Sequence, residues 1–196
     1  MSVIAVLVVV ASVVAVPRSR AEPGLLVFPL RVHQLAGRVV EREAWLDEEI
    51  RTANSLWEPH GLSFVIGERV TLDTTLAVFE NGPGPDPLVS LRAPSFIDVF
   101  VVLEIIDPDA TERHVAGACR SHDERYVVVS VGQDDYVLAH ELGHYFGLHH
   151  TSDPANLMWP HVADRAPAID ATQVSSARAT ATERAMRHEP AALSGL

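Results

Sequence analysis

The sequence contains no lysine, and all 15 of its basic residues are arginines. The chain also has 26 acidic residues, which gives a formal net charge of −11 at pH 7. Proteins that bind nucleic acids present a basic face or stripe. The charge balance therefore excludes a general nucleic-acid-binding function.

Cysteine is almost absent, because Cys119 is the single one in the chain. One cysteine excludes an intramolecular disulfide. It also lies far from the N-terminus, so a lipid-anchored protein is not expected. We expect the Cys119 side chain to pack as a small residue rather than to bind a metal.

The sequence lacks an apolar run of the roughly 20 residues that a transmembrane helix needs. The apolar run at residues 3–16 has the length of a signal-peptide core, and Ser19-Arg20-Ala21 is a small-x-small cleavage site. We expect residues 1–21 to be a signal peptide and the protein to be secreted or periplasmic, without stable membrane association. An uncleaved anchor is the alternative, because no Lys or Arg precedes the run.

The remainder, residues 22–196, is expected to form one domain with an N-terminal subdomain (22–150) and a C-terminal subdomain (151–196). Removal of residues 1–21, which carry two arginines and no acids, changes the net charge from −11 to −13. The chain is 47% hydrophobic, which is enough for one core.

The string HELGHYFGLHH, which begins at His140, is the strongest functional signal. His140 and His144 are four residues apart, so on a helix both imidazoles face the same side. Glu141 points partly aside and can address a water molecule. Imidazole nitrogens suit zinc, and three protein ligands leave a fourth position open for water.

A third ligand is expected from His150. Gly147 can adopt positive φ and end the helix, so the chain can turn and bring His150 back towards the ion. His149 is the neighbouring alternative, but the ten-residue spacing from His140 favours His150. We predict one catalytic zinc bound by His140, His144 and His150.

The motif H-E-x-x-H-x-x-G-x-x-H, followed by Asn156-Leu157-Met158-Trp159-Pro160, resembles the metzincin zinc metallopeptidases and their matrixin-like branch. That branch reads H-E-x-G-H-x-x-G-L-x-H-S-x-x-P-x-x-L-M-Y-P. The residues that match it beyond the histidines and Glu141 are Gly143, Gly147, Leu148, Pro154, Leu157, Met158 and Pro160. The sequence departs from it at Thr151 and Trp159.

The resemblance implies a zinc endopeptidase that hydrolyses peptide bonds in protein or peptide substrates, with Glu141 as the general base. It also implies that Met158 forms an apolar floor under the histidines and that residues 160–162 wall a substrate pocket. A monomer is expected. The alternative is a catalytically silent zinc-binding module of the same fold.

The expected fold is an α+β metzincin-like catalytic domain: a mixed twisted sheet, two long helices, an active-site helix, a Met-turn and a C-terminal helix. Periodicity predicts strands at 25–35, 62–66, 96–106 and 126–131. It predicts helices at 41–58, 136–146 and 170–188. A loop is expected at 80–87, and the substrate-binding edge strand at Val115–Cys119.

Several details follow from single residues. Pro29 indicates an edge strand or a bulge. The apolar stripe of the first helix is Leu46, Ile50, Ala53 and Trp57, with Glu49 expected largely outside it. The helix caps are expected at Asp134 or Asp135 for the active-site helix and at Asp170 for the C-terminal one.

Additional metal sites are left open. His114 and His122 are either solvated loop histidines or ligands of a structural zinc. Asp123 and Glu124 are either solvated or part of a calcium site.

Overall fold

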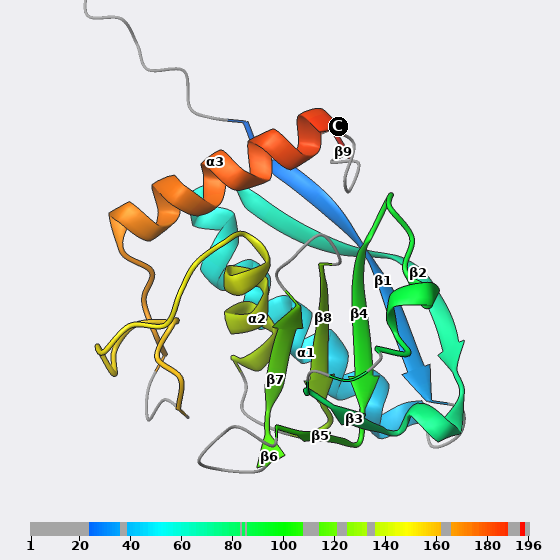
Figure 1. Ribbon diagram of the computed structural model, residues 1–196. Coiled ribbons are helices and arrows are strands. Elements are labelled where there is room, and N and C mark those ends of the chain that lie inside the picture. Colours follow the sequence, from blue (N-terminus) through cyan, green and yellow to red (C-terminus); the bar gives the residue numbers. More distant parts are fainter. Residues whose placement is uncertain are drawn as a thin grey trace, which may run out of the picture.

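The main sheet of the computed structural model has the strand order β2-β1-β4-β8-β7, and β9 pairs with β1 (Figure 1). Strands β2, β1, β4 and β8 are parallel, whereas β7 is antiparallel to β8 and β9 to β1. A smaller sheet has the order β3-β5-β6. The structure describes residues 24–35, 39–82, 84, 86–107, 114–120, 125–132, 136–161, 166–187 and 193–194.

The strands are β1 (Leu26–Leu35), β2 (Leu62–Leu72), β3 (Val78–Glu80), β4 (Ile97–Val102), β5 (Glu104–Ile106), β6 (His114–Val115), β7 (Gly117–Arg120), β8 (Tyr126–Ser130) and β9 (Leu193–Ser194). The helices are α1 (Val39–Trp57), α2 (Val137–Tyr145) and α3 (Ala171–Arg187), with 3-10 turns at Glu58–His60, Thr74–Leu76 and Val89–Leu91. This is the expected mixed α and β architecture in the expected order.

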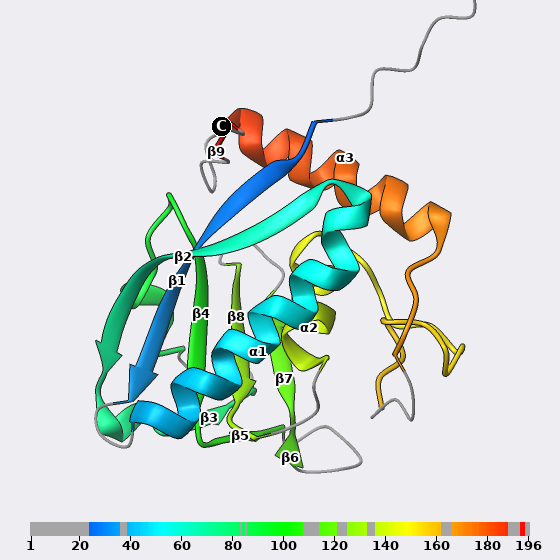
Figure 2. The same cartoon turned by 180° about the vertical axis from the view of Figure 1, so that it is seen from behind.

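Helices α1 and α2 pack side by side on one face of the main sheet, and Figure 2 shows α1 crossing β4 and β8. The predicted stripe of α1 forms this contact, because Leu46, Ala53 and Trp57 are fully buried. Glu49 differs from the expectation, since it is only 1% exposed. It lies beside the stripe, on the side of α1 that meets α2.

Hydrophobic side chains fill both faces of the sheet. In β4, Val99 and Val101 join the core under the helices, while Phe100 and Val102 join a second cluster on the opposite face. The period of two in a strand explains this division. It confirms that the apolar segment starting near residue 96 is a central strand covered on both faces.

That segment is nevertheless two strands rather than one. The chain leaves the main sheet at Leu103, which is 51% exposed and donates its backbone N–H to Ala77 O at 2.9 Å. The following strand, β5, then pairs with β3 and β6 in the small sheet. Apolar composition alone carried no signal for this change of partner.

Pro29 lies in an interior strand, so its interpretation as an edge residue is wrong. It is tolerated because pairing with β4 starts only at Leu30. The register with β2 also shifts between Leu30 and Arg31, which is the irregularity that the alternative interpretation expected. The second strand is longer than predicted and reaches Leu72.

Strand β7 is the predicted edge strand and forms one edge of the main sheet. Its bounds differ from the predicted Val115–Cys119, because Val115 pairs with Ile105 in the small sheet. Gly117–Arg120 is the part that pairs with β8. The chain thus bends at Ala116, between the two sheets.

Helix α3 crosses the end of the sheet at which β1 begins (Figure 1). Asp170 caps it as predicted: its Oδ1 accepts bonds from the backbone N–H groups of Thr172 and Gln173, at 2.8 and 2.9 Å. Gln173 Oε1 accepts the Asp170 N–H in return, which completes a capping box.

No helix within the described ranges combines the length and apolarity that crossing a membrane would require. The signal-peptide prediction for residues 1–21 falls outside the described residues. The cleaved and uncleaved alternatives therefore both remain predictions. The N-cap residue of α2 is Tyr136, so the expected cap at Asp134 or Asp135 is wrong.

Candidate metal centre

Helix α2 brings His140 and His144 together as their spacing predicts. Their Nε2 atoms are 3.1 Å apart. His150 Nε2 lies 3.2 Å from that of His140 and 3.0 Å from that of His144. These three residues are the one group in the described part of the chain whose ligand atoms cluster closely enough to hold a metal ion.

The other ring nitrogens fix the orientation of two imidazoles. His140 Nδ1 lies 2.7 Å from Leu157 O, and His144 Nδ1 lies 2.8 Å from Leu148 O. A carbonyl only accepts, so both Nδ1 atoms carry the hydrogen in the neutral rings. Both Nε2 atoms are then left with lone pairs that point into the same small space.

This donor set fits a zinc ion. Two lone pairs 3.1 Å apart repel each other unless a cation lies between them. Tetrahedral zinc with nitrogen ligands at about 2.0–2.1 Å places those nitrogens about 3.3 Å apart. The observed separations of 3.0–3.2 Å are close to that value.

Burial keeps the imidazoles neutral, as metal ligands must be. Desolvation, with a smaller contribution from His144, lowers the pKa of His140 to about 4. Desolvation is also the main reason why the pKa values of His144 and His150 are lowered. The nitrogens are therefore available to a metal at neutral pH without loss of a proton.

Gly147 makes the turn that returns His150 to the cluster. Its φ is 88°, and its N–H donates to His144 O at 2.9 Å. Leu148 N–H donates to Gly143 O at 3.0 Å, which closes the end of α2. A residue with a Cβ would be strained at this φ.

Met158 lies under the histidine-bearing helix. It is fully buried, and a Cβ at Gly143 would come within 2.5 Å of its sulfur. Gly143 is thus required by the close approach of the Met-turn. Asn156 shapes this turn, since its Oδ1 accepts the Met158 N–H at 2.8 Å and its Nδ2 donates to Gln173 at 2.8 Å.

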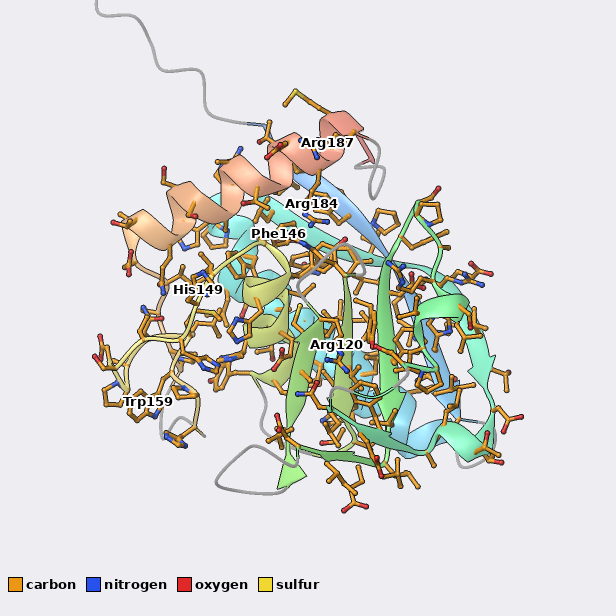
Figure 3. The ribbon with its side chains drawn as sticks, in the orientation of Figure 1. Arg120, Phe146, His149, Trp159, Arg184 and Arg187 are labelled. Atoms are coloured by element: carbon orange, nitrogen blue, oxygen red, sulfur yellow. The ribbon has the colours of Figure 1, made fainter. Side chains whose placement is uncertain are left out.

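His149 is exposed and does not belong to the three-histidine group. Figure 3 shows it on the segment that follows α2, with Trp159 farther along the same region. The third histidine of the group is therefore His150, ten residues after His140, as the spacing predicted. His122, Asp123, Glu124 and the side chain of His114 lie outside the described residues, so the open questions about further metals stay open.

Glu141 is buried in α2, next to His140. It is 5% exposed, and its Oε2 has no hydrogen-bond partner in the described part of the chain. Desolvation raises the pKa of this carboxyl to about 8. A carboxyl with these properties can accept and return a proton near neutral pH.

Gly117 in the edge strand gives Glu141 its space. A Cβ at Gly117 would lie 2.5 Å from Glu141 Oε1 and 2.8 Å from Val137 Cγ2. Sequence reasoning missed this role, although a glycine inside a strand is a known sign of close approach by another group. It also missed Asn156 and Glu49, for which the sequence offers no comparable signal.

Comparisons with known proteins agree with this picture. A family model described as metallo-peptidase family M12 (Reprolysin_5) matches residues 106–186. No curated protein matches the chain.

Among solved structures, the archaemetzincin of Methanopyrus kandleri is similar with a TM-score of 0.57 and 16% identity, over 79% of this chain and 96% of that one. Metalloproteinase-II of Bacteroides fragilis is similar with a TM-score of 0.51 and 13% identity, over 81% of this chain and 55% of that one. At these identities the likeness concerns the fold. The chain thus has a metzincin-like zinc-peptidase fold.

Proposed function

We propose that this protein is a secreted zinc-dependent endopeptidase. His140, His144 and His150 bind the ion, and Glu141 is the general base. The observation that carries the proposal is the convergence of three imidazole nitrogens, with the buried carboxylate of Glu141 next to His140 in the same helix. Its Oε2 has no hydrogen-bond partner among the described residues. Bound zinc would supply a Lewis acid that polarises the scissile carbonyl and lowers the pKa of water to about 7.

Glu141 performs the proton transfers. Its carboxylate accepts the proton of the attacking water and passes it to the leaving amine when the peptide bond breaks. Burial raises the pKa of this carboxyl in the metal-free protein, which favours uptake of the proton from the water. Met158 packs against α2 at Gly143 and takes no part in proton transfer.

The edge strand provides a docking site for an extended peptide. Ser130 N–H donates to Ala116 O at 2.9 Å, so these two residues form a hydrogen-bonded antiparallel pair. At the alternate positions, Gly117 and Cys119 turn their backbone N–H and C=O groups away from β8. A substrate strand that pairs with them lies directly beside Glu141.

The finer parts of the proposal rest on the sequence. The matrixin-like branch rests on the match over residues 140–160, secretion on residues 1–21, and the pocket wall on residues 160–162. We further propose that the mature protein is a monomer of one domain, residues 22–196.

The test uses internally quenched peptides that are blocked at both ends, so that only an internal cut gives a signal. Zinc-loaded protein is expected to cleave them, a chelator to stop cleavage, and added zinc to restore it. One bound zinc per chain without cleavage of any peptide would instead support the catalytically silent zinc-binding module.

A further inference from the structure

The active-site helix α2 begins without a cap from its own sequence neighbours among the described residues. The N-cap residue, Tyr136, makes no side-chain capping bond. The first N–H groups of a helix have no partner within the helix. A partner for one of them comes from α1: the Glu49 carboxylate accepts the Leu138 N–H at 3.0 Å.

Glu49 is an unexpected residue at its position. It is 1% exposed and lies next to the apolar stripe of α1, where a hydrophobic side chain would satisfy packing. Burial of a carboxylate is unfavourable unless hydrogen bonds or opposite charge compensate it. The positive end of the α2 dipole and the Leu138 N–H provide such compensation.

A second side chain of α1 bonds to the same turn of α2. Trp57 is fully buried and donates its Nε1–H to Ala139 O at 3.2 Å. Leu138 and Ala139 directly precede His140 and Glu141. Two buried bonds from α1 therefore hold the backbone from which the first proposed ligand and the proposed base project.

The other end of α2 has a complementary contact. Arg125 Nη1 donates to the carbonyl of Tyr145, the last residue of the helix, at 3.2 Å. An acidic group at the N-terminus and a cationic group at the C-terminus both favour the dipole of the helix. The nine-residue α2 is thus held at both ends by groups from outside the helix.

We propose that Glu49 is a positioning residue of the metal centre. It sets the first turn of α2 so that His140 Nε2 and the Glu141 carboxylate face the space between the three histidines. The proposal rests on the proposed function, because it assigns Glu49 to the geometry of that same site.

The experiment compares Glu49→Ala, which removes both charge and acceptor, with Glu49→Gln, which keeps an acceptor oxygen. Glu48→Ala is the matched control, because Glu48 is the adjacent residue of α1 and pairs on the surface with Arg51. The readouts are the zinc dissociation constant, the absorption spectrum of the cobalt-substituted protein, and kcat and KM for a quenched peptide. All are measured at a temperature at which circular dichroism shows each variant folded.

We expect Glu49→Ala to weaken zinc binding about tenfold, to change the cobalt spectrum, and to lower kcat more than it raises KM. Glu49→Gln should lie between Glu49→Ala and the wild type, and Glu48→Ala should match the wild type. Should Glu49→Ala fail to fold, Glu49→Gln decides alone: a changed cobalt spectrum or weaker zinc binding supports the proposal.

A lower melting temperature with unchanged zinc affinity and cobalt spectrum would overturn the proposal, because Glu49 would then serve stability alone. Failure of the peptidase function has a different signature. A wild type that binds zinc and cobalt but cleaves no peptide would refute the endopeptidase, while altered metal binding in Glu49→Ala would still support the positioning role.

Discussion

Glu141 places a carboxylate where its charge is poorly solvated. The folded-state pKa of about 8 lies above the roughly 4.3 of an unfolded glutamate. A group with a raised folded-state pKa contributes its full stability below the unfolded value, and this contribution is lost as pH rises towards 8. The site therefore costs the metal-free protein stability at neutral and alkaline pH.

Glu141→Gln should remove that cost. We expect the variant to be more stable than the wild type in the metal-free state, by up to roughly 5 kcal/mol at pH 8. The difference should shrink towards zero at pH 4. Urea unfolding of chelator-treated protein across this range measures it, and a stability difference independent of pH would contradict the assigned cause.

Gly117 is a position where one methyl group should reduce activity. In Gly117→Ala, the new Cβ would meet Glu141 Oε1 and Val137, so the carboxylate must shift. We expect peptidase activity to fall at least about tenfold with zinc content unchanged, because small displacements of catalytic groups are costly.

Gly84→Ala is the matched control, since a Cβ there would have no atom within 4 Å. It should retain full activity. Wild-type activity in Gly117→Ala would show that the edge strand leaves the base more room than the structure indicates.

Variants of the two adjacent histidines, His149 and His150, test which of them is the third metal ligand. His150→Ala should lose zinc on dialysis, because two imidazoles remain where three converge. His149→Ala should keep about one zinc per chain, because its side chain lies outside the three-histidine group. Metal analysis after dialysis measures both, and the reverse result would assign the third ligand to His149.

Among the elements, α3 is tied to the start of the domain by one arginine. Arg178 Nη1 donates to His60 O at 2.7 Å, and its Nη2 donates to Gly24 O at 3.4 Å. These bonds join a helix near the end of the chain to the turn before β2 and to the residue two positions before β1.

Arg178→Ala should lower the free energy of unfolding by about 1–3 kcal/mol, because two carbonyls lose a charged donor. Arg187→Ala is the control on the same helix. Its side chain is exposed and pairs with Glu183 on the surface, so an effect below about 0.5 kcal/mol is expected. Chemical denaturation compares them, and equal effects would contradict the role given to Arg178.

At the scale of the whole molecule, the sequence predicted those features that depend on residues close together in the chain. The i, i+4 spacing of His140 and His144 and the capping signal at Asp170 act within a few residues, and both are found as expected. The positive φ of Gly147 likewise follows from the need to turn the chain back towards His150.

Long-range pairing could not be predicted in the same way. Leu103 divides an apolar segment because Ala77, 26 positions earlier, offers a carbonyl, and the composition of the segment gives no sign of it. Pro29 is tolerated in an interior strand because β9 and β4 pair with other parts of β1. Glu49 is buried because its partner is on another helix.

The central claim is that Glu141 drives peptide hydrolysis at a three-histidine zinc centre. The most direct test incubates zinc-loaded wild type and Glu141→Ala, at equal zinc content, with a mixed peptide library and maps the cuts by mass spectrometry. The account predicts internal cuts by the wild type, and none above background by the variant, although both hold zinc. Equal cutting by the two proteins would contradict the account.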